Sequence, residues 1–348
     1  MAIHSPLQKT VIAALPKAEL HLHLEGSIAP ATAVALAARH GVAVAEAEVV
    51  AKYSYHDFSG FLEAFKWVTS FVTEPPDYAL VTEGLVDELL RQNVVYAEVI
   101  VSCGIMLRRQ QDVAANFEAI RKVAERARAR GLRLQWIFDA TRQFGVEPAG
   151  EVARWAVRLR EGGVVAMGMG GDELALPAES FRRAYDIARD AGLHSHVHAG
   201  EVGGPQSIRE AIEFLGAERI GHGIAAMLDP ALMDWMAARG MPVENCPTSN
   251  ICTGALARQL GRAEANLAQH PLPEFMRKNM RVVLSTDDPA MFHTDLMGEY
   301  EVAARLGLST SEILRLARMS FESAFLPLEE RSDLLQTFDS QAISLGLE

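Results

Sequence analysis

Two histidines alternate with leucine in the segment AELHLHLEGS, residues 18–27. Successive side chains of a strand point to opposite faces, so His21 and His23 share one face. A single inward histidine is usually a hydrogen-bonded core residue. Two of them, one residue apart and just before Gly26, where the strand is expected to end, favour metal binding instead.

A second segment, LHSHVHAGE at 193–201, repeats this spacing with His194, His196 and His198. In an α/β barrel the active site is built at the C-terminal ends of the strands. His198 is nearest that end and is the favoured ligand, His194 is the least favoured, and His196 is interpreted as a structural neighbour.

Further polar residues follow other predicted strands: Glu201, His222 in IGHG, and the pair Asp287 and Asp288 in STDDP. Adjacent carboxylates repel each other unless a cation or a hydrogen-bond donor stabilises one of them. A divalent cation bound by one aspartate meets that need. Turn and helix-cap chemistry before Pro289 is the alternative interpretation of this dipeptide.

The candidate ligand set is therefore three imidazoles and one carboxylate, which suits Zn²⁺ better than the oxygen-seeking Mg²⁺ or Ca²⁺. Binuclear barrels of this kind often need a bridging lysine on the fourth strand. The segment VVAMGMGGDE contains no lysine, which favours one zinc ion per chain.

Short apolar runs must position these residues, and they alternate with segments whose apolar residues recur every three to four positions. This alternation predicts a parallel sheet, and eight runs favour a closed (β/α)8 TIM barrel, with a doubly wound sheet plus an extra domain as the alternative. The predicted strands are 18–25, 94–102, 132–140, 164–171, 193–201, 218–224, 241–249 and 281–288.

The longest interval between predicted strands contains FSGFLEAFKWVTSFV, residues 58–72. We expect extra helices here, after the first strand, to cap the barrel mouth. The aromatic residues either pack in the core or shield a flat apolar substrate. Residues 308–348 are expected to form helices under the barrel, and 1–348 to form a single metal-dependent hydrolase domain.

Composition narrows the class of partner. The net charge of -12 argues against nucleic acid, which is bound through clustered Lys and Arg. The N-terminal sequence lacks secretory-signal features, and no apolar run is long enough to cross a membrane. Three cysteines without regular spacing indicate a reducing compartment. We therefore expect a cytoplasmic protein with a small-molecule substrate, and the oligomeric state stays open.

Six segments, in the same order along nearly the whole chain, resemble the adenosine deaminases and their adenyl-deaminase relatives in the amidohydrolase superfamily. The resemblance implies a zinc ion bound by His21, His23, His198 and Asp287, and no organic cofactor. The segments are PKAELHLHLEGS, GGDE, HAGEVGGP, RIGHGI, CPTSNICTGA and STDDPAMF.

The same resemblance implies catalytic roles for Glu201, His222 and Asp288. Glu201 would protonate N1 of a purine, His222 would take a proton from the attacking water and steer the hydroxide, and Asp288 would hydrogen-bond near N7. Gly171 in GGDE would offer its N–H to N3, and His23 and Glu25 are also expected at the substrate. Glu201 must be protonated beforehand, so we expect burial to raise its pKa.

The implied reaction is hydrolytic deamination of a 6-aminopurine nucleoside, with adenosine or 2′-deoxyadenosine, giving inosine or its deoxy form, as the leading substrates. Glu25 departs from the Asp that is usual in adenosine-specific enzymes. The alternatives are adenine, or a 5′-modified adenosine such as aminodeoxyfutalosine or methylthioadenosine, whereas a carboxylate should reject a 5′-phosphate. The nucleic-acid-editing zinc deaminases are excluded, because the sequence has no PCxxC to combine with an H-x-E motif.

Overall fold

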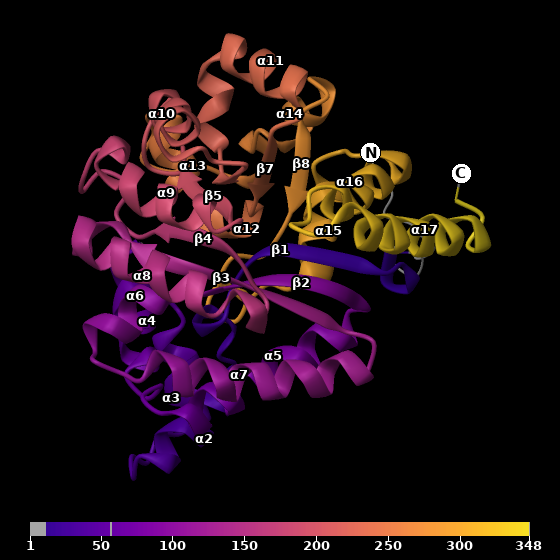
Figure 1. Ribbon diagram of the computed structural model, residues 1–348. Coiled ribbons are helices and arrows are strands. Elements are labelled where there is room, and N and C mark those ends of the chain that lie inside the picture. The colour runs from indigo at the N-terminus through magenta and orange to yellow at the C-terminus, as the bar shows by residue number, and fades with distance from the viewer. Residues whose placement is uncertain (1–11, 56–57, 348) are drawn as a thin grey trace.

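The computed structural model describes residues 12–55 and 58–347 and forms a (β/α)8 barrel (Figure 1). All eight strands are parallel and follow one another in sequence order around the sheet, which excludes the doubly wound alternative. The strands are β1 (Lys17–His23), β2 (Val94–Val101), β3 (Arg133–Thr141), β4 (Val164–Gly170), β5 (His194–Ala199), β6 (Arg219–His222), β7 (Pro242–Asn245) and β8 (Arg281–Leu284).

Helices surround the strands and bury their outward faces, which explains why the strands read as apolar runs. The α-helices are α2 (Pro30–Arg39), α3 (Glu46–Lys52), α4 (Phe58–Thr69), α5 (Pro75–Arg91), α6 (Cys103–Arg108), α7 (Val113–Ala129), α8 (Val146–Arg158), α9 (Arg182–Asp190), α10 (Pro205–Leu215), α11 (Pro230–Arg239), α12 (Pro247–Cys252), α13 (Ala255–Gln259), α14 (Leu272–Arg277), α15 (Leu296–Arg305), α16 (Thr310–Glu322) and α17 (Leu328–Ser344). Short 3₁₀ helices are η1 (Glu25–Ser27), η2 (Arg142–Phe144), η3 (Arg160–Gly162), η4 (Ala178–Phe181), η5 (Ile224–Leu228) and η6 (Leu267–Gln269).

The barrel closes between its first and last strands just beyond the end of β8. An isolated parallel bridge joins Leu22 to Asp287. The N–H of His23 donates to the Asp287 carbonyl at 2.8 Å, and the Asp287 N–H donates to the His21 carbonyl at 3.0 Å. The closing seam therefore fixes three of the predicted ligands relative to one another.

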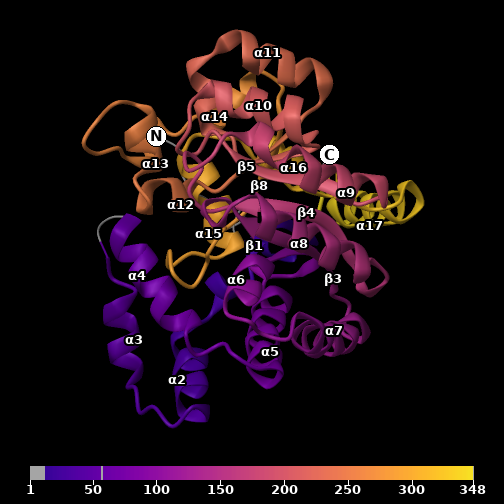
Figure 2. The same ribbon diagram turned by 60° about the vertical axis from the view of Figure 1, so that its left-hand side comes forward.

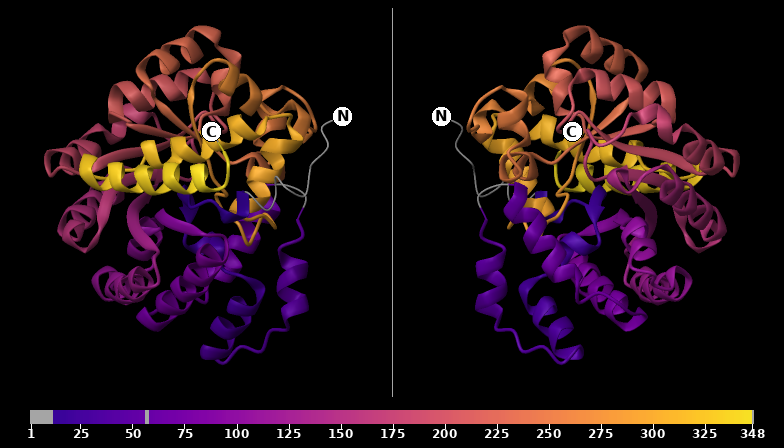
Figure 3. Two further views of the ribbon diagram at one scale, coloured as in Figure 1. Left: turned by 90° about the vertical axis from the view of Figure 1, so that its right-hand side faces the viewer. Right: turned by 90° about the vertical axis from the view of Figure 1, so that its left-hand side faces the viewer.

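Helices α2, α3 and α4 form a layer beside the barrel (Figures 2 and 3). The ring of Phe61 on α4 lies 5.0 Å from that of Phe292, which follows the Asp288 segment. The hydroxyl of Tyr55 donates to the Met291 carbonyl at 2.6 Å. The predicted capping helix thus packs against a loop at the barrel mouth.

The opposite end of the barrel is covered by the C-terminal segment, as predicted. Helix α16 contacts β1 and β8, and α17 packs on α16 through Phe321 and Phe338, whose rings are 5.6 Å apart. Phe325 enters the barrel interior beside Ile100 and Ile137. Within the described ranges, no helix has the length and apolar character that a membrane span requires.

Candidate active site

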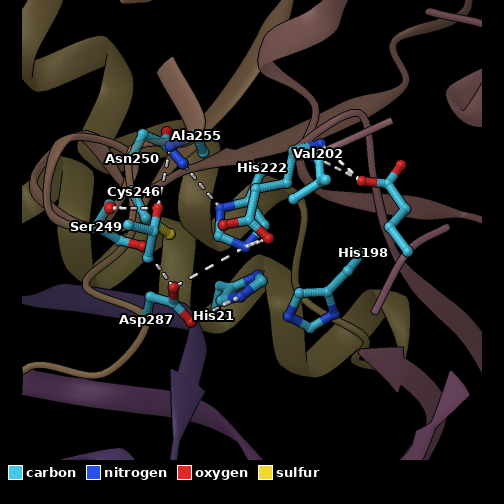
Figure 4. A network of polar contacts seen from close by, with 12 residues as sticks. His21, His198, Val202, His222, Cys246, Ser249, Asn250, Ala255 and Asp287 are labelled. Carbon is cyan, nitrogen blue, oxygen red and sulfur yellow. Dashed lines mark hydrogen bonds and ion pairs between the residues drawn. The ribbon is translucent and has the colours of Figure 1, made fainter. Parts of the chain in front are cut away.

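Four of the predicted residues converge at the C-terminal ends of β1 and β5 and in the segment after β8. Figure 4 labels three of them, His21, His198 and Asp287. His23 Nε2 lies 3.3 Å from His198 Nε2 and 3.2 Å from Asp287 Oδ1. His21 Nε2 lies 3.4 Å from the same carboxylate oxygen. One ligand atom from each of the four residues lies within 4.8 Å of the others, so the set can hold a metal ion.

The outer ring nitrogens of two histidines have partners that orient the rings. His21 Nδ1 lies 2.6 Å from Glu244 Oε2, and His198 Nδ1 lies 3.1 Å from the Met169 carbonyl. Protons on these Nδ1 atoms leave both Nε2 lone pairs facing the centre, as in many metal sites. His21 Nε2 is buried without a hydrogen-bond partner among the described residues, so a metal ion fits this gap.

Burial and neighbouring charges shift the pKa values of His198 and Asp287 in this cluster. Burial, together with the neighbouring His21 ring, lowers the pKa of His198 well below its usual value, which favours the neutral imidazole that metal binding requires. Burial opposes charge on Asp287, yet its bonds to His21 and His23 hold the pKa of this carboxyl well below its usual value. Three ring nitrogens and one carboxylate match the ligand chemistry of zinc.

The side chains of the two adjacent aspartates differ in their surroundings. Asp287 Oδ2 accepts a hydrogen bond from Ser249 Oγ at 2.7 Å. Asp288 Oδ1 is buried with no partner in the part of the chain that the structure describes. Burial and then the neighbouring Asp287 raise the pKa of Asp288 to about 8. A Cβ on Gly26 would lie 1.8 Å from Asp288 Oδ1, so only glycine allows this approach.

His222 ends β6 and faces two carboxylates (Figure 4). Its Nε2 lies 3.6 Å from Glu201 Oε2 and 3.9 Å from Asp287 Oδ2. Asn250 Nδ2 lies 3.1 Å from His222 Nδ1 and donates to it in this orientation. Burial lowers the pKa of His222 to about 3, so the ring is neutral and carries its proton on Nε2.

Glu201 follows β5 and its side chain is only 16% exposed. Burial, followed by the carboxylates of Asp287 and Glu173, raises the pKa of Glu201 to about 8. The expected rise in this pKa is confirmed, and the group is protonated at neutral pH.

The remaining predicted residues lie at the ends of β1 and β4. Glu25 is buried, and its Oε1 accepts from the Ser102 N–H at 3.2 Å, whereas its Oε2 has no partner among the residues described. Gly171 has a φ of +88°, and a Cβ there would lie 2.3 Å from Gln143 Oε1. Glycine at 171 therefore lets the chain pass close to η2.

Glu244 is a central residue that the sequence did not single out. Its carboxylate bonds to His21, to His196 Nε2 at 2.7 Å, and to Arg219. His196 is thus a structural neighbour, as predicted. The signal was a charged residue within a short, fully buried strand, PVEN, but its partners come from other strands.

His194 and Arg142 each have a partner outside the cluster of candidate ligands. His194 lies away from the cluster, with its ring stacked 4.3 Å from that of Phe325, as its low ranking as a ligand implied. Arg142, in η2, donates from Nη1 to the Leu176 carbonyl at 3.3 Å.

The chain is similar to known deaminases in sequence. A family model described as adenosine deaminase matches residues 16–341. An aminodeoxyfutalosine deaminase of Streptomyces coelicolor is 40% identical, covering 94% of this chain and 85% of that protein. An adenine deaminase of Rhizobium leguminosarum bv. trifolii is 36% identical, covering 92% of this chain and 98% of that protein.

Two solved structures are also similar. The adenine deaminase of Arthrobacter aurescens superposes with a TM-score of 0.86 at 27% identity, covering 94% of this chain and 99% of that one. The N6-mAMP deaminase of Arabidopsis gives a TM-score of 0.82 at 28% identity, with coverages of 94% and 99%. Barrel, site and relatives agree, and the chain belongs to the adenosine deaminase family of aminopurine aminohydrolases.

Proposed function

We propose that the protein hydrolytically deaminates an adenosine nucleoside carrying a substituent at its 5′ position, as in aminodeoxyfutalosine. The observation that carries this proposal is Glu25, which stands where adenosine-specific members of the family usually have Asp. Its Oε1 accepts from the Ser102 N–H, and its Oε2 has no hydrogen-bond partner among the described residues. This free oxygen can accept from a sugar hydroxyl, while the longer side chain alters the 5′ end of the site.

The relatives support this choice over plain adenosine. Proteins named aminodeoxyfutalosine deaminase, from Streptomyces coelicolor and Streptomyces avermitilis, are 40% and 39% identical to this chain. A 5′-phosphate, as in N6-mAMP, would place negative charge near Glu25 and is disfavoured.

The proposed metal is zinc, held by His21, His23, His198 and Asp287. When bound, zinc lowers the pKa of water toward about 7 and so supplies hydroxide at neutral pH. The buried carboxylates and histidines of this chain then bind and orient the purine around the reacting carbon, C6.

Glu201 is assigned as the proton donor. Because its pKa is raised to about 8, it holds a proton that it can donate to N1, which makes C6 electrophilic. We assign Asp288 to a hydrogen bond at N7 and the Gly171 N–H to N3.

His222 is assigned to orient the attacking oxygen. With Asn250 donating to Nδ1, neutral His222 presents an N–H from Nε2. This arrangement supports the steering part of the role expected from sequence. Proton removal by this ring would first require the Asn250 amide to turn over.

Adenine is a second candidate substrate, favoured by the 36% identical Rhizobium relative of that name. The test is ammonia release by the zinc-loaded protein offered aminodeoxyfutalosine, methylthioadenosine, adenosine and adenine side by side. The highest kcat/KM on a 5′-modified nucleoside supports the proposal. The highest value on adenine or adenosine overturns the assignment of Glu25, and no ammonia from any of them overturns the deaminase function.

A further inference from the structure

We propose that Glu173 is a positioning residue that fixes the backbone of the loop carrying Glu201. This inference rests on the proposed function of Glu201 as the proton donor. Glu173 lies in the loop after β4 and is 7% exposed. The Glu201 loop follows β5, which pairs with β4, so the two loops are neighbours at the same end of the barrel.

The Glu173 carboxyl group accepts hydrogen bonds from four consecutive N–H groups of the loop, those of residues 200–203. Glu173 Oε1 accepts from the Gly200 N–H at 2.6 Å and from Ser207 Oγ at 2.5 Å. Its Oε2 accepts from the N–H groups of Glu201, Val202 and Gly203 at 3.2, 2.8 and 2.8 Å. Five hydrogen bonds to one carboxyl group hold the loop firmly.

A second side chain binds the carbonyl groups of the same loop. Gln259, at the end of α13, donates from Nε2 to the carbonyls of Glu201 at 2.8 Å and of Gly203 at 2.7 Å. Donors and acceptors of the loop are thus bound from two sides. Figure 4 draws Val202 of this loop in the same close-up as His222 and His198.

The sequence of the loop is adapted to this contact. A Cβ on Gly203 would lie 2.6 Å from Glu173 Oε1 and 2.8 Å from Ser207 Oγ. Gly200 has a φ of +71°, which glycine adopts without strain. Glu173 and Gln259 together form a clamp on this loop. Because they bind only backbone atoms of residue 201, the Glu201 carboxyl stays available for the substrate.

The test is the kcat of Glu173→Gln, normalised to zinc-loaded folded protein. The Gln side chain has an NH₂ group in place of one carboxylate oxygen. This group cannot accept from the backbone N–H donors, so part of the five hydrogen bonds is lost. A displacement of about 1 Å can cost about 100-fold, so we expect kcat to fall about 100-fold, with zinc content and KM little changed. Glu213→Gln on the exposed face of α10 is the matched control and should keep full activity.

Two further measurements separate positioning from mere folding stability. In the Glu201→Gln background, Glu173→Gln should reduce kcat no further, because both changes remove the same function. Amide hydrogen exchange at 200–203 should accelerate in Glu173→Gln. Gln259→Leu, which leaves the carboxylate in place, should give a smaller loss of kcat of about tenfold.

The outcomes distinguish this inference from the proposed function. If the unmodified protein deaminates an aminopurine but Glu173→Gln keeps its kcat within twofold, or the two mutations multiply, the positioning role is overturned. Unchanged exchange at 200–203 overturns the clamp itself, even if the protein proves inactive on every aminopurine.

Discussion

Two of the candidate active-site residues have backbone conformations that side-chain-bearing residues rarely adopt. His222 has a φ of +60° and Asp287 a φ of +70°. Such conformations cost energy and persist only where surrounding contacts impose them. Asp287 is held by backbone bonds to β1, and the His222 carbonyl accepts from Asn245 Nδ2 at 2.7 Å. Two of the six described non-glycine residues with a positive φ therefore lie where the chemistry is proposed.

Replacement of Glu201 by Gln should remove turnover without removing the metal. Gln cannot donate a proton to N1, and general acid catalysis contributes about 10²–10⁴-fold. We expect kcat to fall about 1,000-fold while the zinc content, measured by atomic absorption, stays that of the unmodified protein. Asp287→Ala, expected to lose zinc and activity together, is the reference. Full activity in Glu201→Gln would remove Glu201 as the acid.

Replacement of Glu244 by Gln should weaken metal binding. The carboxylate orients the His21 ring through a 2.6 Å contact with Nδ1, and loss of such a partner typically costs about 10–100-fold in metal affinity or activity. Competition with a chelating dye measures the zinc affinity. Glu218→Gln is the matched control, because Glu218 bonds His194, outside the cluster. Equal affinities in the two variants would contradict the role of Glu244.

Sequence alone predicted the residues whose pattern is local. His21 and His23 were predicted because alternation along β1 places both on one face, and His198 because the same spacing recurs along β5. Glu244 and Glu173 were not, because their importance lies in contacts with other strands and loops. A single buried carboxylate leaves no repeating pattern in the sequence, and its hydrogen-bond donors are distant along the chain.

At the scale of the elements, all eight strands were predicted, since buried parallel strands read as apolar runs. Their ends were less well predicted. The seventh run was expected to extend over 241–249, but β7 ends at Asn245 because α12 begins at Pro247, a favoured first helical residue. The eighth run leaves regular pairing after Leu284, because Asp287 turns to close the barrel against β1.

Helix α4 should support the barrel mouth through Phe61. This ring is 8% exposed and lies 5.0 Å from the ring of Phe292 and 5.8 Å from that of Tyr55. Phe61→Ala should lower the free energy of unfolding by about 3 kcal/mol. It should also raise KM more than it changes kcat, because the Phe292 N–H bonds the Asp288 carbonyl at 3.0 Å.

Urea denaturation and steady-state kinetics check both expectations for α4. Phe58→Ala is the control, since Phe58 is 42% exposed on the same helix and should matter less to stability. A KM unchanged in Phe61→Ala would mean that α4 has no influence on substrate binding.

At the scale of the whole molecule, charge is distributed unevenly between surface and interior. The net charge is -12, yet several carboxylates are buried in the barrel and between its helices. Glu299 on α15 is fully buried and accepts from Thr294 Oγ1 at 2.6 Å and from the Thr248 N–H at 3.3 Å. Burial raises the pKa of Glu299 from its usual 4.5 to about 7.

This shift has a definite consequence for stability against pH. Between about 4.5 and 7 the folded chain holds a proton on Glu299 that the unfolded chain has released, so this group's contribution falls as pH rises. A shift of this size corresponds to about 3 kcal/mol. In Glu299→Gln that dependence is absent, so the variant should gain stability relative to the unmodified protein on going from pH 5 to pH 8. Urea denaturation at each pH measures the difference, with the exposed Glu264→Gln as control. Parallel curves for all three proteins would mean that Glu299 is ionised in the folded chain at pH 5 and contributes no pH dependence.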